Sequence, residues 1–457
     1  MSAPTITLVG AGGMSFGPTM VNDVIRTPAL AGARLVLHDV NPARLQRAYA
    51  FASRLNAAAG SPVVLDRSTE PGESLEGADF VMSSAEFGRF HYRRQDYEVP
   101  NRHGARQING ENGGPGAVFH SLRSIHNTIS ICRSIERYCP DAFLVNLSNP
   151  LSRVALAIDR ATDLRTVSMC HEMPGGIYRL SKFLRLDATE VEGRAAGINH
   201  FTFFTELRHR PTGEDLLPRV RALFERRFFD YSDRTKAVLR RMSRRRSLGV
   251  VADEIYMPLV VHMVRTYGLV PCSIDSHIGE YLPFTADVAD WFPVRVDVME
   301  GFSDLTESLS SWVARTRVPL PLHRVGHSHE EVVPILAALW TGTPRRIMAM
   351  NVPNRGNVPN VADGAIVEVG GTVDGDGLHP DTVEPLDPRL AEWTATQVEL
   401  QDLIVESALT GDPDLAFRAL LEDPLSPADP AACRAMFDEL CALQSEHLPF
   451  DPPVGAR

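Results

Sequence analysis

The chain has 457 residues, of which 44% are hydrophobic and 23% charged, and its formal net charge is −11. That length is more than one core needs and predicts two domains, spanning 1–195 and 196–457. The negative charge argues against binding to nucleic acid or to a membrane surface. The sequence contains no run of about 18 apolar residues, the length that is needed to cross a bilayer. The N-terminus carries no signal pattern and the six cysteines form no CxxC pair, so we expect a cytoplasmic protein with reduced thiols.

The first element is an apolar strand over residues 5–9, followed by a glycine-rich turn, Gly10-Ala-Gly-Gly13, and then a helical pattern. Gly10 can form the tight turn and Gly12 lets backbone amides approach a pyrophosphate, while the helix offers free N–H groups. A second strand, 33–39, ends at Asp39, 27 residues after Gly12, where a carboxylate would accept a ribose hydroxyl and favour NAD over NADP. The alternative is that the glycines only form a turn.

Strand and helix patterns alternate after this point. Strands are predicted at 78–84, 142–146 and 165–169, and helices at 41–59, 115–138 and after Pro150. This alternation predicts an α/β fold with a Rossmann-type, doubly wound parallel sheet. Beyond residue 200 longer helices and β-rich stretches predict an α+β C-terminal domain, with a loop at 370–387 and amphipathic helices at 388–421.

In such sheets ligands bind outside the carboxyl ends of the strands, where this chain has polar residues. Cys170 follows one strand, and His200 ends the segment Gly197-Ile-Asn-His200. A thiolate and an imidazole could bind one divalent metal and leave positions open for substrate hydroxyls. The alternative is a buried, apolar cysteine and a core histidine.

Three other segments carry candidate residues. Asn149 could bind a sugar hydroxyl, or form an Asx turn before Pro150. Glu111 lies in a glycine-dense loop, 109–116, that either covers the cofactor or only leads into a helix. Asp275 and Tyr281 belong to a polar cluster that could supply a proton acceptor, or be solvated loop residues.

Taken in order, these motifs resemble glycoside hydrolase family 4 over most of the chain. The resemblance is carried by Gly10-Ala-Gly12, Arg93-Arg-Gln-Asp96, Gly110-Glu111, Gly114-Pro-Gly116, Asn146 to Pro150, Cys170-His171-Glu172, Gly197 to His200, Asn351 to Asn360, and Glu368. Where the family has Gln-Glu-Thr, this chain has Gly-Glu-Asn around Glu111.

The resemblance implies a lactate/malate dehydrogenase-like fold, bound NAD⁺ and usually Mn²⁺, a homodimer or homotetramer, and glycoside hydrolysis by an oxidation and elimination. NAD⁺ takes a hydride from C3 and so acidifies the C2 proton. A base removes that proton, the metal stabilises the enediolate, the aglycone leaves C1, water adds, and the hydride returns.

Carried onto this sequence, the resemblance assigns roles residue by residue. Cys170 and His200 would bind the metal, Asp275 or, second, Tyr281 would be the base, and Glu111 the acid. Cofactor contacts are expected from Gly10, Gly12, Gly13, Met14, Asp39, Ser84 and Glu86. Substrate contacts are expected from Asn149, His171, Asn199, Arg89 and Arg94.

The sequence says less about the substrate than about the fold and the cofactors. His171-Glu172 after the cysteine resembles members that act on unphosphorylated α-glucosides or α-galactosides. Arginines at 89–94 and 244–246 could instead pair with an anion at C6, as in a uronide or a sulfoquinovoside, or be solvated. Two other classes stay open: an NAD-dependent hydroxy-acid or sugar dehydrogenase that releases NADH, and a non-enzymatic NAD-binding protein.

Overall fold

The computed structural model describes residues 3–13, 16–243, 254–289, 295–316, 328 and 330–450. Over these residues one sheet of twelve strands forms, in the order β3-β2-β1-β4-β5-β6-β10-β11-β7-β8-β9, with β12 paired to β11. The first six strands in the chain pair in parallel. They are β1 (Thr5–Val9), β2 (Arg34–His38), β3 (Val64–Ser68), β4 (Phe80–Ser83), β5 (Phe143–Asn146) and β6 (Arg165–Ser168).

Helices cover both faces of this parallel sheet because successive side chains of each strand point to opposite faces. Leu8 of β1 packs in the core with α1 (Gly17–Arg26) and α2 (Pro42–Ala58). Val9 packs in a second core with α5 (Pro115–Tyr138) and α6 (Leu151–Ala161). The predicted α/β fold with a doubly wound sheet is confirmed.

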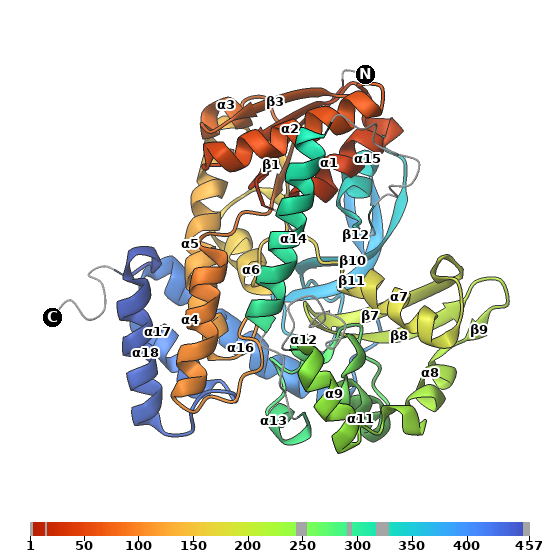
Figure 1. Cartoon of the computed structure of the whole chain (residues 1–457), viewed down its shortest axis with the longest axis vertical. Coiled ribbons are helices and arrows are strands. Elements are labelled where there is room, and N and C mark those ends of the chain that lie inside the picture. The colour runs from red at the N-terminus through yellow and green to blue at the C-terminus, as the bar shows by residue number, and fades with distance from the viewer. Residues whose placement is uncertain are drawn as a thin grey trace.

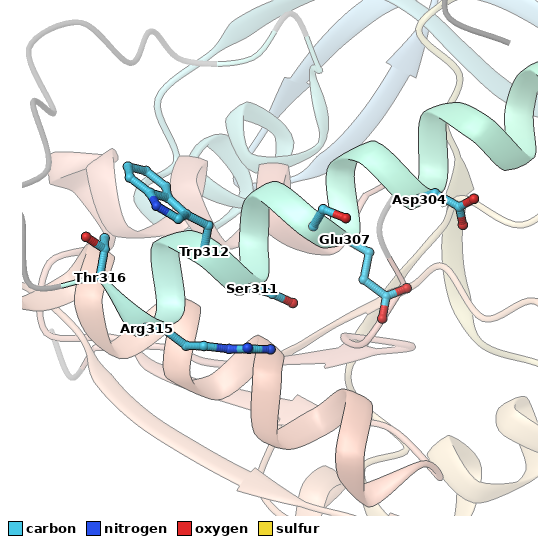
Figure 2. Close-up of a pocket in the computed structure, with 7 residues that line it drawn as sticks. Asp304, Glu307, Ser311, Trp312, Arg315 and Thr316 are labelled. Atoms are coloured by element: carbon cyan, nitrogen blue, oxygen red, sulfur yellow. The ribbon is translucent and has the colours of Figure 1, made fainter.

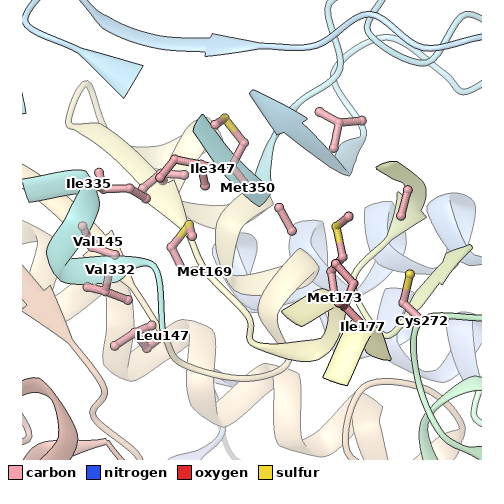
Figure 3. Close-up of a cluster of buried hydrophobic side chains, with 14 of the residues drawn as sticks. Val145, Leu147, Met169, Met173, Ile177, Cys272, Val332, Ile335, Ile347 and Met350 are labelled. Atoms are coloured by element: carbon pink, nitrogen blue, oxygen red, sulfur yellow. The ribbon is translucent and has the colours of Figure 1, made fainter. Parts of the chain in front are cut away.

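The sheet continues without a break into antiparallel strands, because β10 (Arg345–Pro353) pairs with β6. The other strands of this part are β7 (Val191–Ile198), β8 (Phe201–His209), β9 (Glu214–Asp215), β11 (Ile366–Asp374) and β12 (Gly377–Pro380). Apolar side chains join the two parts: Val145 and Leu147 lie in one cluster with Val332 and Ile335 of α15 (Val332–Thr341) and with Met350 (Figure 3).

The remaining helices surround this sheet (Figure 1). They are α3 (Pro71–Leu75), α4 (Arg89–Arg102), α7 (Glu172–Leu184), α8 (Leu217–Phe224), α9 (Asp233–Ser243), α11 (Pro258–Tyr267), α12 (Asp275–Ile278), α13 (Thr285–Val288), α14 (Arg295–Arg315), α16 (Pro388–Thr410), α17 (Pro413–Glu422) and α18 (Pro430–Gln444). In Figure 1, α14 runs beside α4 and reaches α2, which it contacts. No helix in the described ranges is long and apolar enough to cross a membrane.

The prediction of a loop over residues 370–387 is wrong for the first part of that range. β11 continues to Asp374 and turns back into β12, with Gly371 opposite Pro380. A Cβ at Gly371 would lie 2.6 Å from the His379 carbonyl oxygen. Glycine is present there because the two strands approach closely, and not because the chain lacks regular structure.

Candidate active site

A cavity of about 750 Å³ lies outside the carboxyl ends of β1, β4 and β5. Its wall at one end includes Gly10, Gly12, Gly13 and Asp39, and Ser84, Glu86, Arg89, Glu111 and Asn149 also line it. The predicted cofactor loop and several predicted catalytic or substrate residues therefore share one cavity.

The glycine loop presents backbone to this cavity. Gly10 has φ +80°, and a Cβ there would lie 3.0 Å from the backbone of Ala85. The Gly12 N–H donates to Asp39 Oδ2 at 2.9 Å, and a Cβ at Gly12 would lie 2.6 Å from the same oxygen. Only glycine fits both positions, so amides can approach a pyrophosphate, and Asp39 is fixed beside them. Met14 lies outside the described residues.

Glu111 forms a buried, bidentate ion pair with Arg93 of α4. Arg93 Nη1 and Nη2 lie 2.7 and 3.0 Å from the two carboxylate oxygens. Burial disfavours a charge here, but the Arg93 guanidinium outweighs it and holds the pKa of Glu111 well below its usual value. A carboxylate held in this way favours the ionised form, which accepts hydrogen bonds, whereas the sequence predicts an acid at Glu111.

Glu280 holds the loop that carries Glu111. Its carboxylate accepts the backbone N–H groups of Glu111 and Asn112. A Cβ at Gly113 would lie 2.3 Å from the Glu280 carbonyl oxygen, so the loop can approach only because that residue is glycine. The Asn112 side-chain amide in turn lies 3.0 Å from His200 Nδ1.

Behind this loop, Glu172, His200 and His277 offer ligand atoms that all lie within 4.8 Å of one another. Glu172 Oε1 is 2.8 Å from His277 Nδ1, and the two imidazole rings stack with centroids 4.1 Å apart. Burial opposes a charge on His277, but the Glu172 carboxylate raises its pKa to about 9. One carboxylate and two imidazoles form a donor set that fits a divalent cation.

Cys170, the predicted partner of His200, is not among the three residues whose ligand atoms converge, but it lies close to Glu172 and Asn199. Its thiol contacts the Asn199 side chain, and burial, reinforced by Glu172 and Glu368, raises its pKa well above the usual value. Glu368 accepts hydrogen bonds from Asn199, at 3.0 Å, and from Thr202, at 2.9 Å.

His200 itself occupies a strained position. It has φ +64° in the tight turn between β7 and β8. Such a conformation costs a non-glycine residue on the order of 1 kcal/mol, and residues of this kind concentrate at functional sites.

The two base candidates differ in their surroundings. Both oxygens of Asp275 accept backbone N–H groups at the start of α11, from Leu259 at 2.7 Å and from Val260 at 2.8 Å. Asp275 therefore caps the start of α11, and neither Asp275 nor Tyr281 is among the described residues that line the cavity. Tyr281 is buried, and its hydroxyl donates to the carbonyl of Asn199, the neighbour of His200, at 3.0 Å.

The structure places the predicted substrate residues in different surroundings. The Asn149 amide nitrogen lies 3.4 Å from Glu111 Oε1, and its Oδ1 is buried without a partner among the described residues. Arg89 lines the cavity and pairs with Glu86 at 2.9 Å. Arg94 instead pairs with Glu300 of α14, and the exposed His171 lies 3.4 Å from Glu330.

Sequence reasoning missed three residues of this site. His277 and Glu172 were not identified as candidate metal ligands, although both lie in polar motifs. His120 was not identified at all: it donates from Nδ1 to the Glu111 carbonyl at 2.9 Å, and its Nε2 faces Glu86 at 3.7 Å. It lies in the second turn of helix α5, where no local signal distinguishes it from a core residue.

This fold and site define a Rossmann-type protein in which the loop of Glu111 links the cavity at the glycine turn to a candidate metal-ligand cluster. Two family models, "Family 4 glycosyl hydrolase" and its C-terminal domain, match residues 5–186 and 195–426. The chain is 30% identical to an alpha-glucosidase of Erwinia rhapontici, over 98% of this chain and 99% of that protein. It is 26% identical to an alpha-galactosidase of Bacillus subtilis, over 97% and 99% of the two chains. The chain belongs to glycoside hydrolase family 4, as its motifs predicted, and is a glycosidase.

Solved structures agree on the fold. A 6-phospho-alpha-glucosidase from gut microorganisms, solved in complex with NAD and Mn²⁺, has a TM-score of 0.80 at 21% identity over 98% of this chain and 99% of that one. A malate dehydrogenase from Plasmodium falciparum has a TM-score of 0.50 at 13% identity over 90% and 99%. The predicted dehydrogenase-like fold is confirmed, and the predicted cofactors, NAD and Mn²⁺, are those in the complex of the phosphoglucosidase.

Proposed function

We propose that this chain hydrolyses unphosphorylated, neutral α-hexosides with NAD⁺ and a divalent metal ion. One observation carries the proposal: the cofactor loop, Asn149 and Glu111 line one cavity, and the loop of Glu111 contacts His200 of the metal-ligand cluster. A sugar ring held by Asn149 would thus lie between the cofactor loop and the metal-ligand cluster.

The chain's residues fit both groups. The Gly10–Gly13 amides and Asp39 would hold NAD⁺, while Cys170, Glu172, His200 and His277 would hold the metal, most simply Mn²⁺. When bound, NAD⁺ accepts and returns a hydride at C3, and the cation stabilises negative charge on the sugar oxygens.

Three residues would act on the sugar directly. The unpartnered Asn149 Oδ1 would accept a sugar hydroxyl, and the ionised Glu111 carboxylate would accept a second one. Tyr281 would take the C2 proton, since its hydroxyl lies one residue from His200, whereas both oxygens of Asp275 are occupied by backbone N–H groups.

The charges around the cavity support a neutral sugar. Arg89, which lines the cavity, is paired with Glu86, and Arg93 is paired with Glu111. Arg44, the other arginine in the described lining, lies beside Gly12 at the cofactor end. A sulfonate, carboxylate or phosphate at C6 would meet these two carboxylates and gain no unpaired arginine there. Arg94 is directed toward α14, and Arg244 to Arg246 lie outside the described residues.

The proposal is tested with 4-nitrophenyl α- and β-glycosides carrying gluco, galacto, glucurono or sulfoquinovo sugars, with NAD⁺ and Mn²⁺ each present or absent, and with a thiol reductant. We expect nitrophenol from the α-gluco or α-galacto substrate only when NAD⁺ is present, without net NADH. NADH formed in proportion to product would support the alternative dehydrogenase function. Preferential cleavage of the glucurono or sulfoquinovo sugar would overturn the neutral-sugar assignment.

A further inference from the structure

Helix α14 supplies part of the wall of the cofactor cavity. Its Ser303 and Glu307, which lie one helical turn apart on the same face, both line that cavity. Glu307 also lines a small hollow with Gly17, next to the glycine turn. In Figure 2, Glu307 extends from one side of α14 and Trp312 from another. The helix therefore brings a carboxylate to the cofactor end of the cavity, although it lies far from the glycine turn in the sequence.

The carboxylate of Asp39 is already partly occupied at this end. Its Oδ2 accepts the Gly12 N–H at 2.9 Å, and its Oδ1 accepts the Asn41 N–H at 2.8 Å. In dinucleotide-binding folds an acid at the end of the second strand accepts the adenosine ribose, which offers two neighbouring hydroxyls. Because each oxygen of Asp39 holds a backbone group, a second carboxylate would complete the binding of that diol.

Glu307 can take this part without losing its present partner. Its Oε1 lies 2.7 Å from Arg47 Nη2 of α2, and the two side chains are 44% and 34% exposed. A partly exposed ion pair of this kind contributes little to stability, so it does not fix the carboxylate rigidly. A carboxylate can also accept several hydrogen bonds, so Glu307 can keep Arg47 and accept a ribose hydroxyl as well.

We propose that Glu307 binds the adenosine ribose of NAD⁺ together with Asp39, and that these two carboxylates exclude NADP⁺. The inference rests on the proposed function, which assigns NAD⁺ to this cavity. A 2′-phosphate would bring its negative charge to both carboxylates, and the repulsion would oppose its binding. By pairing with Arg47, Glu307 also occupies a cation that could otherwise pair with that phosphate.

Two arginines of α2 make the assignment testable. Arg44 lines the cavity, and a Cβ at Gly12 would lie 2.6 Å from the Arg44 Cβ. Arg47 lies one turn further along the same helix. In NADP-binding proteins of this fold an arginine near the second strand receives the 2′-phosphate. This chain therefore has the cations that NADP⁺ binding uses, and Glu307 occupies one of them.

The test measures the Kd of the full-length protein for NAD⁺ and for NADP⁺ by calorimetry. Glu307→Gln keeps the shape of the side chain but removes its charge. We expect the Kd for NAD⁺ to rise about tenfold and the Kd for NADP⁺ to fall about tenfold. Asp304→Asn is the matched control and should keep both constants, because Asp304 is an exposed carboxylate of α14 that is not among the described residues lining the cofactor cavity. Equal melting temperatures would show that both variants fold.

Arg47→Gln distinguishes a direct contact from an indirect one. If Glu307 binds the ribose itself, Arg47→Gln should keep the wild-type Kd for NAD⁺. The double variant Glu307→Gln, Arg47→Gln should lose the gain in NADP⁺ affinity, because the released guanidinium is then absent. An equal loss of NAD⁺ affinity in Arg47→Gln and Glu307→Gln would mean that the ion pair only holds the two helices together, and it would overturn the inference.

Failure of this inference and failure of the proposed function give different results. If the wild type binds NAD⁺ and Gly12→Ala weakens that binding, while Glu307→Gln changes neither constant, the inference is wrong and the proposed function stands. If the wild-type protein does not bind NAD⁺, the proposed function fails and this inference fails with it.

Discussion

The cofactor end and the metal end of the active site are built in different ways. At the cofactor end the proposed binding groups are backbone amides of one short segment, Gly10–Gly13, beside Asp39. At the metal end Glu172, His200 and His277 come from three distant segments, and His200 has a strained backbone. The first end depends on local chain geometry, whereas the second depends on how the antiparallel strands and α12 pack.

The two ends also differ in electrostatics. Asp39 remains partly exposed, whereas Glu111, Glu172 and His277 are buried and already paired. Removing one member of a buried pair leaves an uncompensated charge, which costs more than removing a surface charge. We therefore expect the metal end to be more sensitive to single substitutions than the cofactor end.

His200→Ala should give the largest effect. It removes an imidazole from the centre of the cluster, so we expect Mn²⁺ binding, measured by calorimetry, to weaken at least about 100-fold and kcat to fall about 1,000-fold. His209→Ala, at the far end of β8, is the control and should retain both. If His200→Ala bound Mn²⁺ with the wild-type affinity, the metal would bind at another place in the molecule.

Tyr281→Phe and Asp275→Asn test which of these two residues removes the C2 proton and which one caps helix α11. We expect Tyr281→Phe to lower kcat about 100-fold or more, and to cost about 0.5–1.5 kcal/mol in the free energy of unfolding because its buried hydroxyl donates one hydrogen bond. Asp275→Asn should instead cost about 1–3 kcal/mol in the free energy of unfolding, because one buried N–H loses its acceptor. Urea unfolding and steady-state kinetics of both variants provide the measurement. The reverse pattern would restore Asp275 as the base.

Gly12→Ala tests the cofactor end with a smaller effect. The added Cβ would lie 2.6 Å from Asp39 Oδ2. We expect the Kd for NAD⁺, measured by calorimetry, to rise about 10-fold to 100-fold while Mn²⁺ still binds. Gly175→Ala is the control, because a Cβ there meets nothing within 4 Å. An unchanged Kd in Gly12→Ala would contradict a cofactor role for this turn.

Glu331→Gln, where the parallel and antiparallel parts of the sheet meet, should have the smallest effect. Burial raises the pKa of Glu331 to about 7, and its carboxylate accepts the Met348 N–H at 2.7 Å. Because the folded pKa lies above the usual 4.5, this group's contribution to stability is complete below that pH and is lost as the pH rises through about 7.

Glu331→Gln has no carboxyl to ionise, so it should lose less stability between pH 5 and pH 8 than the wild type does. We expect a difference of about 1–2 kcal/mol in the free energy of unfolding at pH 8 and little difference at pH 5. Urea titrations at the two pH values provide the measurement, and parallel pH profiles would show that Glu331 does not titrate in this range.

The same contrast explains what could be predicted from the sequence. The cofactor turn, Asp39 and the parallel strands follow from patterns within about 40 residues of one another, so they could be predicted. Cys170 and His200 were predicted as ligands through ordered motifs, and His200 belongs to the group of converging ligand atoms. His277 could not be placed beside them, because its position depends on the cap that Asp275 forms on α11. Similarly, Gly370 and Gly371 led to the prediction of a loop. In the structure these glycines instead allow two strands to pair closely. The domain boundary at 195/196 and the cytoplasmic location stay predictions.

The most direct test of the mechanism is hydrolysis of the best α-glycoside in D₂O with NAD⁺ and Mn²⁺, followed by mass spectrometry of the released sugar. Removal of the C2 proton by Tyr281 and its replacement from solvent predict one deuterium at C2 per turnover, with no net NADH. A product without deuterium at C2 would contradict proton removal at that carbon.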